Sequence, residues 1–301
     1  PKIKAEEFID TDLRKISWTV NLKSDIIKNY EHKLYIDKLL KGLYRPFTKQ
    51  HLYYDKALIE RPGLNRIFFP DTKSDNIVIA FSGVGSSKDF STFVSGDLTS
   101  YDLLEKTQCL PLYYFEESLN TDNELFNEGS KSTRRDAITD FILNKAQKQY
   151  TNKVTKEDIF YYVYGFLHSP EYRETFANDL KKSLPRLPLV EMESDFWAFS
   201  QAGRKLADLH LNYEQVPAYE GVTVRMPEDL LRMDAYEFYR VEKMRFPKKG
   251  EKGTIVYNSR IVVEHIPEEA YDYIVNGKSA IEWIMERYQV TVHKESGIKN
   301  D

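Results

Sequence analysis

The sequence predicts an α+β fold, because its strand-like and helix-like segments fall into separate blocks. Two regions of short apolar runs, 44–116 and 219–266, flank a helical block at 155–213. Strands and helices do not alternate one by one, as a doubly wound parallel sheet would require. We expect a strand-rich lobe with flanking helices over residues 1–150. The helical block, a hairpin and C-terminal helices are expected over 151–301, and the two parts should form one unit.

The N-terminal lobe begins with charged, helix-like sequence. An approximately helical stripe surrounds Gly42, which we expect near the end of a helix. The stripe consists of Leu34, Ile36, Leu39, Leu40 and Leu43. The next runs are separated by Pro, Gly, Asp and Ser, which predicts strands and turns at 44–47, 51–56, 66–70, 76–81, 91–96 and 109–115. The polar residues 118–135 predict a loop or linker, and residues 136–150 predict a helix.

The helical block should contain three helices with well-marked starts. Thr155 and Asp158 match a capping box, and Ser169 before Pro170 is typical of a helix start. Prolines at 185 and 188 should end the second helix, and Ser194 is expected to cap the third.

Strands are expected again after the block, at 221–227, 236–246, 253–258 and 260–266. Residues 247–253 should form the turn of a hairpin. Pro267 is expected to open a helix that closes at Gly277, and Ser279 with Glu282 predicts a second capping box.

Composition limits the possible functions. The net charge of −4 means that the chain as a whole is not a basic nucleic-acid binder. The single Cys109 can build neither an internal disulfide nor a multi-cysteine zinc site, and it is compatible with a reducing compartment. The six histidines lack metal-binding spacing, and no apolar run approaches the roughly 20 residues that span a bilayer. The chain shows no signal peptide and begins at Pro1, so we expect an excised fragment or a processed chain, located in the cytoplasm.

One glycine-containing segment resembles a cofactor loop. Residues 81–85 read FSGVG and follow an apolar strand, as in the F-x-G-x-G loop of S-adenosylmethionine-dependent methyltransferases. The sequence lacks the N/D-P-P-Y/F motif that an adenine methyltransferase uses to hold a flipped base, and it has no P-loop. A turn between two strands is therefore the favoured interpretation. We assign no catalytic, cofactor-binding or metal-binding residue.

Two basic segments are candidate DNA contacts. Residues 240–260 hold seven Lys or Arg against two Glu, and residues 41–66 hold six against one Asp and one Glu. A two-stranded ribbon fits the major groove, where Lys, Arg and Asn contact phosphates or bases. The candidates are Lys243, Arg245, Lys248, Lys249, Lys252, Asn258, Arg260, Arg45, Lys49, Lys56, Arg61 and Arg66. Solvated hairpin tips would show the same charge pattern, so each segment alone leaves both interpretations open.

Several blocks of the chain, in order, resemble the C-terminal specificity region of Type ISP restriction–modification enzymes, in which one polypeptide carries all activities. They are 43–63, 108–117, 158–190, 196–214 and 276–290. The resemblance implies a target recognition domain that selects a site in double-stranded DNA. It holds the duplex while a methyltransferase domain flips an adenine for N6 methylation, and it licenses ATP-driven translocation and cleavage. S-adenosylmethionine, ATP and Mg²⁺ would be used by other domains and none by this fragment. Its partners would be duplex DNA and the methyltransferase and helicase domains.

Two other functions remain open at this stage. The chain could be part of an S-adenosylmethionine-dependent methyltransferase that uses Phe81–Gly85, which cofactor binding would reveal. It could also be a structural coupler whose aromatic helical block docks on other domains without touching DNA. In the favoured interpretation the helical block is a scaffold and the strand-rich regions carry the DNA surface.

Overall fold

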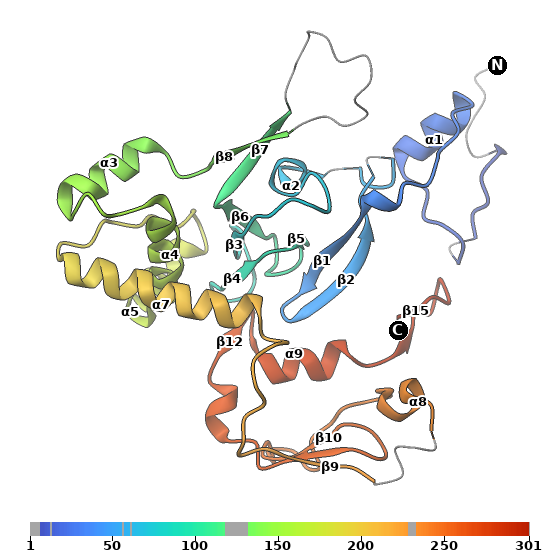
Figure 1. Cartoon of the computed structure of the whole chain (residues 1–301). Helices are drawn as coiled ribbons and strands as arrows, with labels where there is room; N and C mark the ends of the chain where they lie inside the picture. The colour runs from blue at the N-terminus through green and yellow to red at the C-terminus, as the bar shows by residue number, and fades with distance from the viewer. Residues whose placement is uncertain are drawn as a thin grey trace.

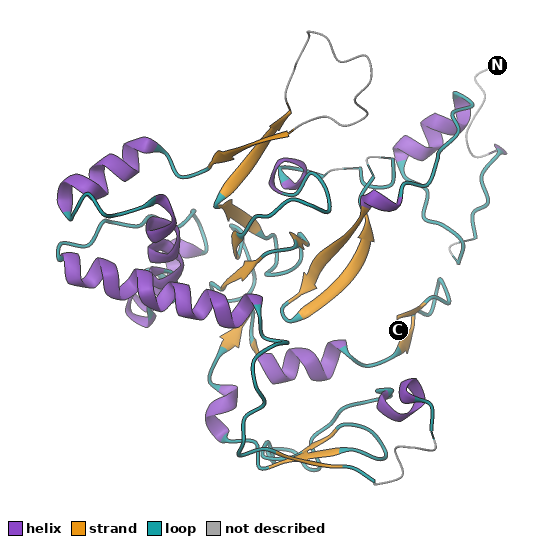
Figure 2. Ribbon diagram, viewed as in Figure 1, coloured by secondary structure: helices purple, strands orange, loops and turns teal. Residues whose placement is uncertain are grey.

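The computed structural model describes residues 7–12, 14–55, 57–60, 62–117, 132–227 and 233–300. It has the α+β architecture that the sequence predicts, with several small sheets and separate groups of helices (Figure 1). The helical block lies beside the central strands, and a C-terminal lobe, made of the described residues after Tyr219, lies at one end of the molecule. Figure 2 shows that helices dominate the helical block, whereas short strands and loops dominate the C-terminal lobe.

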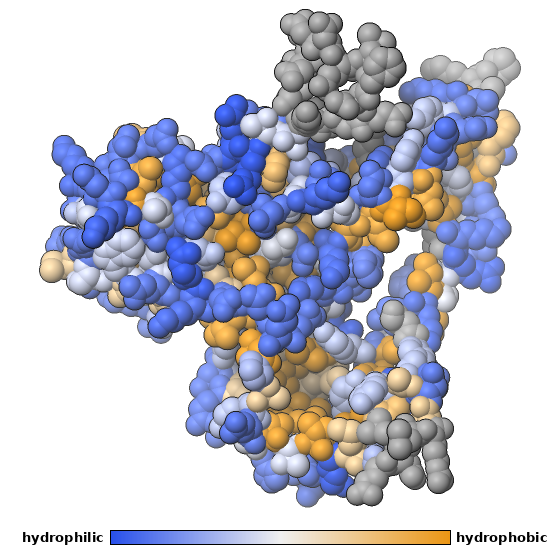
Figure 3. Space-filling model, in the orientation of Figure 1, coloured by the Kyte–Doolittle hydropathy of each residue, from blue (hydrophilic) through white to orange (hydrophobic). Residues whose placement is uncertain are grey.

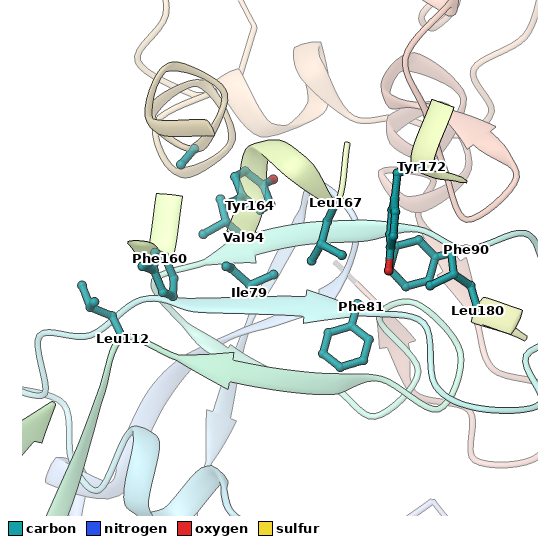
Figure 4. Packing of buried hydrophobic residues seen from close by; sticks show 11 residues of the cluster. Ile79, Phe81, Phe90, Val94, Leu112, Phe160, Tyr164, Leu167, Tyr172 and Leu180 are labelled. Carbon is teal, nitrogen blue, oxygen red and sulfur yellow. The ribbon is translucent and has the colours of Figure 1, made fainter. Parts of the chain in front are cut away.

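The centre of the molecule is an antiparallel sheet in the order β4-β3-β6, with bounds β3 Val78–Phe81, β4 Thr92–Ser95 and β6 Gln108–Pro111. All residues of β3 are buried, because the strand has neighbours on both faces. Ile79 and Phe81 contact Phe160, Tyr164 and Leu167 of the helical block (Figure 4). The alternate residues face the N-terminal sheet and its neighbours. The two largest cores therefore share one strand.

The N-terminal sheet has the order β2-β1-β5, with bounds β1 Leu39–Arg45, β2 Thr48–Tyr53 and β5 Leu98–Thr99. Strand β1 pairs antiparallel with β2 and parallel with β5, which leaves β2 at the sheet edge. Upstream lie α1 (Val20–Ile27), capped by the Thr19 side chain, and the 3₁₀ turn η2 (Ile36–Lys38).

The helix expected around residues 34–43 is wrong, because only the 3₁₀ turn η2 forms there before β1 begins. Leu40 and Leu43 lie in β1 and are buried against the central sheet, so tertiary packing outweighs the approximate helical spacing. The strand expected at 66–70 is also wrong, since α2 (Asn65–Phe68) is a short helix. In such short apolar runs, the periodicity of the sequence does not distinguish a strand from a helix, and the tertiary contacts decide the conformation.

The strands and helix around the expected polar loop are partly as predicted. Strand β7 (Tyr113–Glu117) pairs with β8 (Ser132–Asp136), which the sequence places in the loop. Residues 118–131 lie outside the described part of the chain. The helix expected at 136–150 is confirmed as α3 (Asp140–Gln149), capped by Thr139.

The helical block contains α4 (Lys156–Phe166), α5 (Pro170–Thr175), α6 (Ala177–Leu180) and α7 (Glu193–Leu211). The capping box of Thr155 and Asp158 and the Ser169 cap are confirmed. Helix α7 begins after Met192, however, so Ser194 lies inside the helix and does not cap it.

The C-terminal lobe contains a sheet in the order β10-β11-β9, with bounds β9 Thr223–Arg225, β10 Ile255–Val256 and β11 Val262–Glu264. The strand expected at 236–246 is wrong. Its start forms α8 (Ala235–Tyr239), which is capped by Asp234, and only Arg245 of the remaining residues makes a β-bridge. The hairpin expected around 247–253 is closed by a single antiparallel bridge between Arg245 and Val256.

The last elements of this lobe connect its three-stranded sheet with the N-terminal sheet. They are η4 (Glu268–Tyr271), the pair β12 (Ile274–Val275) and β13 (Lys278–Ser279), α9 (Ala280–Arg287), and the pair β14 (Thr291–Val292) and β15 (Lys299–Asn300). The helix expected from Pro267 is thus one 3₁₀ turn, whereas the capping box at Ser279 is confirmed. Trp283 of α9 packs in the same cluster as Leu43 and Phe47.

No helix within the described residues is both long and apolar enough to cross a membrane.

Candidate nucleic-acid interface

A groove of about 660 Å³ separates strand β2 from the C-terminal lobe. We call it the β2 groove. Its lining residues are Thr48, Lys49, Gln50, His51, Tyr236, Tyr239, Arg240, Val241, Tyr257, Arg287, Tyr288, Gln289, Val290, Lys299 and Asn300. Figure 3 shows the surface hollowed between the body of the molecule and this lobe. The groove draws on both basic segments, since Lys49 comes from one and Arg240 from the other.

The chemistry of the lining is unusual for a chain with excess negative charge. Four of its residues are Lys or Arg, four are Tyr, and three are Asn or Gln, whereas none of these described lining residues is Asp or Glu. Burial raises the pKa of Tyr257 and of Tyr288, so both phenols remain protonated hydrogen-bond donors at neutral pH. The groove therefore offers positive charge, amide groups and aromatic faces together.

Three of the groove cations have partners within the protein. Lys49 Nζ lies 3.2 Å from Glu214 Oε2, and Arg287 Nη2 lies 2.6 Å from Glu286 Oε1. Lys299 Nζ donates a hydrogen bond of 2.8 Å to the Tyr236 hydroxyl. Arg240 differs, because it forms no ion pair with any described residue. Its buried Nε lacks a hydrogen-bond acceptor there, as does the Nε of Arg287.

The backbone that carries Tyr239 and Arg240 is held by side chains from the β10–β11 turn. Four consecutive carbonyl oxygens, of residues 237–240, each accept a hydrogen bond from this turn. The bonds run from Arg260 Nη1 to Glu237 O at 3.2 Å, Asn258 Nδ2 to Phe238 O at 2.9 Å, Tyr257 Oη to Tyr239 O at 2.8 Å, and Asn258 Nδ2 to Arg240 O at 3.2 Å. We call Tyr257, Asn258 and Arg260 the carbonyl clamp.

The side chain of Asn258, a predicted DNA contact, is hydrogen-bonded within the protein. Its side chain is only 8% exposed, and its Oδ1 accepts from the backbone N–H groups of Arg260 and Ile261 at 2.8 and 2.9 Å. Both donors and both acceptor positions of the amide are used inside the protein. Asn258 has no free group for a DNA base, and we leave it out of the proposed contacts.

The other predicted contacts of segment 240–260 are mostly exposed. Lys243, Arg245, Lys248 and Lys249 point into solvent, the last two at the hairpin turn. Lys252 instead lies 3.2 Å from Glu282 Oε1 and 4.7 Å from the centre of the Tyr271 ring. It holds the turn against the start of α9. Arg260 is exposed apart from its bond to Glu237.

The structure does not bring the described predicted contacts of segment 41–66 together. Of Arg45, Lys49 and Arg66, only Lys49 lines the β2 groove. Arg45 stacks on the Tyr44 ring, with Cζ 4.1 Å from the ring centre, and Arg66 is exposed on α2. Lys56 and Arg61 lie outside the described residues.

The FSGVG segment is a packed turn between β3 and the loop that leads to β4. A Cβ atom on Gly83 would lie 2.0 Å from the Lys106 carbonyl oxygen, and the Gly85 N–H donates to Lys181 O at 2.9 Å. The glycines thus allow close approach of this chain's own backbone. The interpretation as a turn between strands is confirmed, and the cofactor-loop alternative is not favoured.

Several groove residues were not predicted from the sequence. Gln50, Tyr239, Tyr288 and Gln289 have no distinctive local pattern, and only Arg240 could be noticed, as part of the basic segment. Among the described residues, no group of three or more His, Cys, Asp or Glu side chains is placed to hold a metal ion.

Comparisons with known proteins agree with the resemblance seen in the sequence. A family model described as the Type ISP C-terminal specificity domain matches residues 1–301. None of the curated proteins searched gives a significant match.

Three solved structures have the same fold over almost the whole chain. The ATP-dependent Type ISP restriction-modification enzyme LlaBIII bound to DNA has a TM-score of 0.83 and 38% identity, covering 97% of this chain and 18% of its own. A nuclease-deletion mutant of the Type ISP enzyme LlaGI with a DNA substrate mimic has a TM-score of 0.80 and 37% identity, covering 100% and 25%. The DrdV–DNA complex has a TM-score of 0.80 and 29% identity, covering 97% and 27%.

The chain thus spans 18–27% of the length of these solved chains. The family model covers every residue, and the identity to two Type ISP enzymes exceeds one third. The chain belongs to the Type ISP C-terminal specificity domain family.

Proposed function

We propose that this domain recognises a target sequence in double-stranded DNA for a Type ISP restriction–modification enzyme, and that the β2 groove contacts the DNA. The observation that carries the proposal is the lining of the groove, which combines Lys and Arg with amides and tyrosines and contains no Asp or Glu among its described residues. Two related enzymes of the same family, at 38% and 37% identity, are described as complexes with DNA or a DNA mimic.

The chemistry of the groove suits duplex DNA. Lys and Arg neutralise phosphates and fix the register of the protein on the duplex, whereas Arg, Asn and Gln read base edges. The chain carries a net charge of −4, so a cation-lined groove concentrates attraction for a polyanion at one place. The exposed Lys248 and Lys249 at the hairpin turn are candidates for further phosphate contacts.

The chemical steps belong to other domains in this proposal. The parent polypeptide would methylate adenine with S-adenosylmethionine, and would use ATP and Mg²⁺ for translocation and cleavage. The helical block supplies scaffold and an interface to those domains, since exposed aromatic residues such as Phe141 and Phe176 lie on it or beside it. A coupler role for the helical block is compatible with DNA recognition by the groove.

Photocrosslinking tests the proposed surface directly. In the full-length protein, Tyr288 in the groove is replaced by the photoreactive benzoyl-phenylalanine, because the residue is 44% exposed and its ring is similar in shape. The matched control places the same photoreactive residue at Phe141 on α3, which is 78% exposed. We expect irradiation with duplex DNA to crosslink the Tyr288 variant and not the Phe141 variant. Crosslinks at Phe141 with none at Tyr288 would contradict the proposal.

A further inference from the structure

We infer that Arg240 determines specificity by reading a guanine in the recognised site, and that Asn258 is the residue that positions it. The inference rests on the proposed function, since it assigns a base contact within the β2 groove. Two observations distinguish Arg240 from the other groove cations. Its guanidinium has no ion-pair partner among the described residues, and its backbone is held by the carbonyl clamp.

The first observation concerns the side chain. Arg240 is half-buried in the groove, has no ion pair with a described residue, and leaves its Nε buried without an acceptor. Lys49, Arg287 and Lys299 each have a protein partner within 3.2 Å. Arg287 Nε is also buried without an acceptor, but its Nη2 is paired with Glu286, whereas the Arg240 guanidinium has no ion-pair partner among the described residues. A buried donor without an acceptor is costly, so a ligand that supplies acceptors would remove that cost. The planar guanidinium suits a ligand with two adjacent acceptors.

The second observation concerns the backbone. Helix α8 ends at Tyr239, and Arg240 follows in an extended conformation with φ −56° and ψ 130°. An extended residue just after a short helix would normally be free to move. Here the carbonyl clamp fixes the carbonyls on both sides of it, at Tyr239 and at Arg240 itself. The direction in which the side chain leaves the backbone is therefore set before any ligand arrives.

Asn258 can hold only one orientation of its amide. Its Oδ1 faces two N–H donors and its Nδ2 faces two carbonyl oxygens, so a flipped amide would oppose like groups at all four positions. The position of the Arg240 carbonyl thus depends on this one side chain.

An arginine is suited to reading a base when its backbone is fixed and its guanidinium has no ion-pair partner within the protein. In the major groove guanine presents O6 and N7 as adjacent acceptors, and a bidentate arginine is the commonest specific contact to that pair. Phosphate contact needs no fixed direction, because a flexible and exposed side chain can reach phosphates equally well. The geometry therefore points to a G·C pair in the recognised site.

Selection from a random-sequence duplex pool tests this inference. The full-length protein binds the pool, and sequencing of the bound DNA gives the relative affinity for each base at each position. Arg240→Lys keeps the positive charge and loses the pair of parallel N–H donors. We expect it to reduce the preference for guanine at one position by about 10- to 100-fold. The remaining positions should keep their preferences.

Asn258→Asp tests the positioning role. Aspartate retains the two acceptor contacts of Oδ1 and loses the donor to the Phe238 and Arg240 carbonyls. The preference should weaken at the same position as in Arg240→Lys, by a smaller factor. If Asn258 had only a structural role, Asn258→Asp would lower the stability of the protein and leave the selected DNA motif unchanged. Arg186→Lys, the same exchange at an exposed arginine of the helical block, is the matched control.

The possible results separate the inference from the function on which it rests. If the unaltered protein enriches no sequence, the proposed function fails. If it enriches a motif that Arg240→Lys leaves unchanged, or that weakens uniformly at every position, Arg240 is not a base reader and the inference fails alone. Arg240→Lys decides the question by itself if Asn258→Asp does not fold.

Discussion

At the residue scale, the helical block and the central sheet meet at a buried group of histidines and tyrosines. His210 is 7% exposed, lies 2.6 Å from the Tyr164 hydroxyl through Nδ1, and stacks on Phe93 at 4.6 Å between ring centres. His168 lies beside it, with Nε2 3.2 Å from the Tyr273 hydroxyl. Burial lowers the pKa of His210 to about 4 and is also the main cause that lowers the pKa of His168 to about 3.

These histidines make stability depend on pH in one direction. An unfolded histidine has a pKa of about 6.5, so below that value the unfolded chain takes up protons that native His210 does not. The contribution of neutral His210 is present above pH 6.5 and is lost as the pH falls toward 4. Between pH 7 and pH 5 this histidine alone should lower the free energy of unfolding by about 2 kcal/mol. Urea unfolding of the 301-residue chain at the two pH values measures it.

Replacement of the His210 imidazole tests whether this residue causes the pH dependence of stability. His210→Gln should shrink the loss between pH 7 and pH 5, whereas His293→Gln, which changes an exposed histidine near the C-terminus, should not. An undiminished pH dependence in His210→Gln would show that other groups cause it.

Single residues also show why a functional surface is hard to predict from sequence. The basic segment 240–260 drew attention to this region, but the sequence made Asn258 a candidate DNA contact and left Arg240 out of the candidates. The structure separates them, because the Asn258 amide is saturated by the backbone and the Arg240 guanidinium is not. Residue type and charge density do not report which hydrogen-bonding groups remain free after folding.

At the element scale, helices α4 and α7 cross at two glycines. A Cβ atom on Gly203 of α7 would lie 2.0 Å from the Tyr161 carbonyl oxygen, and one on Gly165 of α4 would lie 2.2 Å from the Phe199 carbonyl oxygen. Both obstacles are backbone atoms, which cannot move aside without shifting a helix. The glycines let the two helix backbones approach closely, and this crossing supports the core beneath it.

Replacement of Gly203 by Ala should therefore destabilise the protein, against the usual helix preference. Ala in place of Gly normally stabilises a helix interior by about 1 kcal/mol. Here we expect a loss of about 2 kcal/mol or more from overpacking. Chemical denaturation of the 301-residue chain measures the change, and Gln201→Ala, at an exposed position of the same helix, is the control. A stabilised Gly203→Ala variant would mean that the helices cross less closely than described.

The elements that could be predicted are those fixed by local contacts. The capping boxes at Thr155 and Ser279 and the Ser169 cap depend on residues three apart, and all three were predicted correctly. Short aromatic or apolar runs gave mixed results, because β1 and α8 were assigned to the wrong class. Their conformation depends on neighbours far along the chain, and no periodicity in five to seven residues reports those neighbours.

At the scale of the whole molecule, the β2 groove is assembled from distant parts of the chain. Its walls come from residues 48–51, 236, 239–241, 257, 287–290 and 299–300. The packing of Trp283 with Leu43 and Phe47 holds the two walls beside each other. The fold class and the two basic regions could be predicted from the sequence. The groove could not, since its existence depends on how the C-terminal lobe meets the N-terminal sheet.

The central claim is that this domain chooses the DNA site, and exchange of the domain tests it most directly. The adenines methylated by the natural full-length protein are mapped in a host genome. The segment equivalent to residues 1–301 is then replaced by that of a relative with a different site, and the map is repeated. We expect the methylated motif to change to that of the donor of the segment. A motif that stays the same would place recognition elsewhere and leave this domain as a coupler.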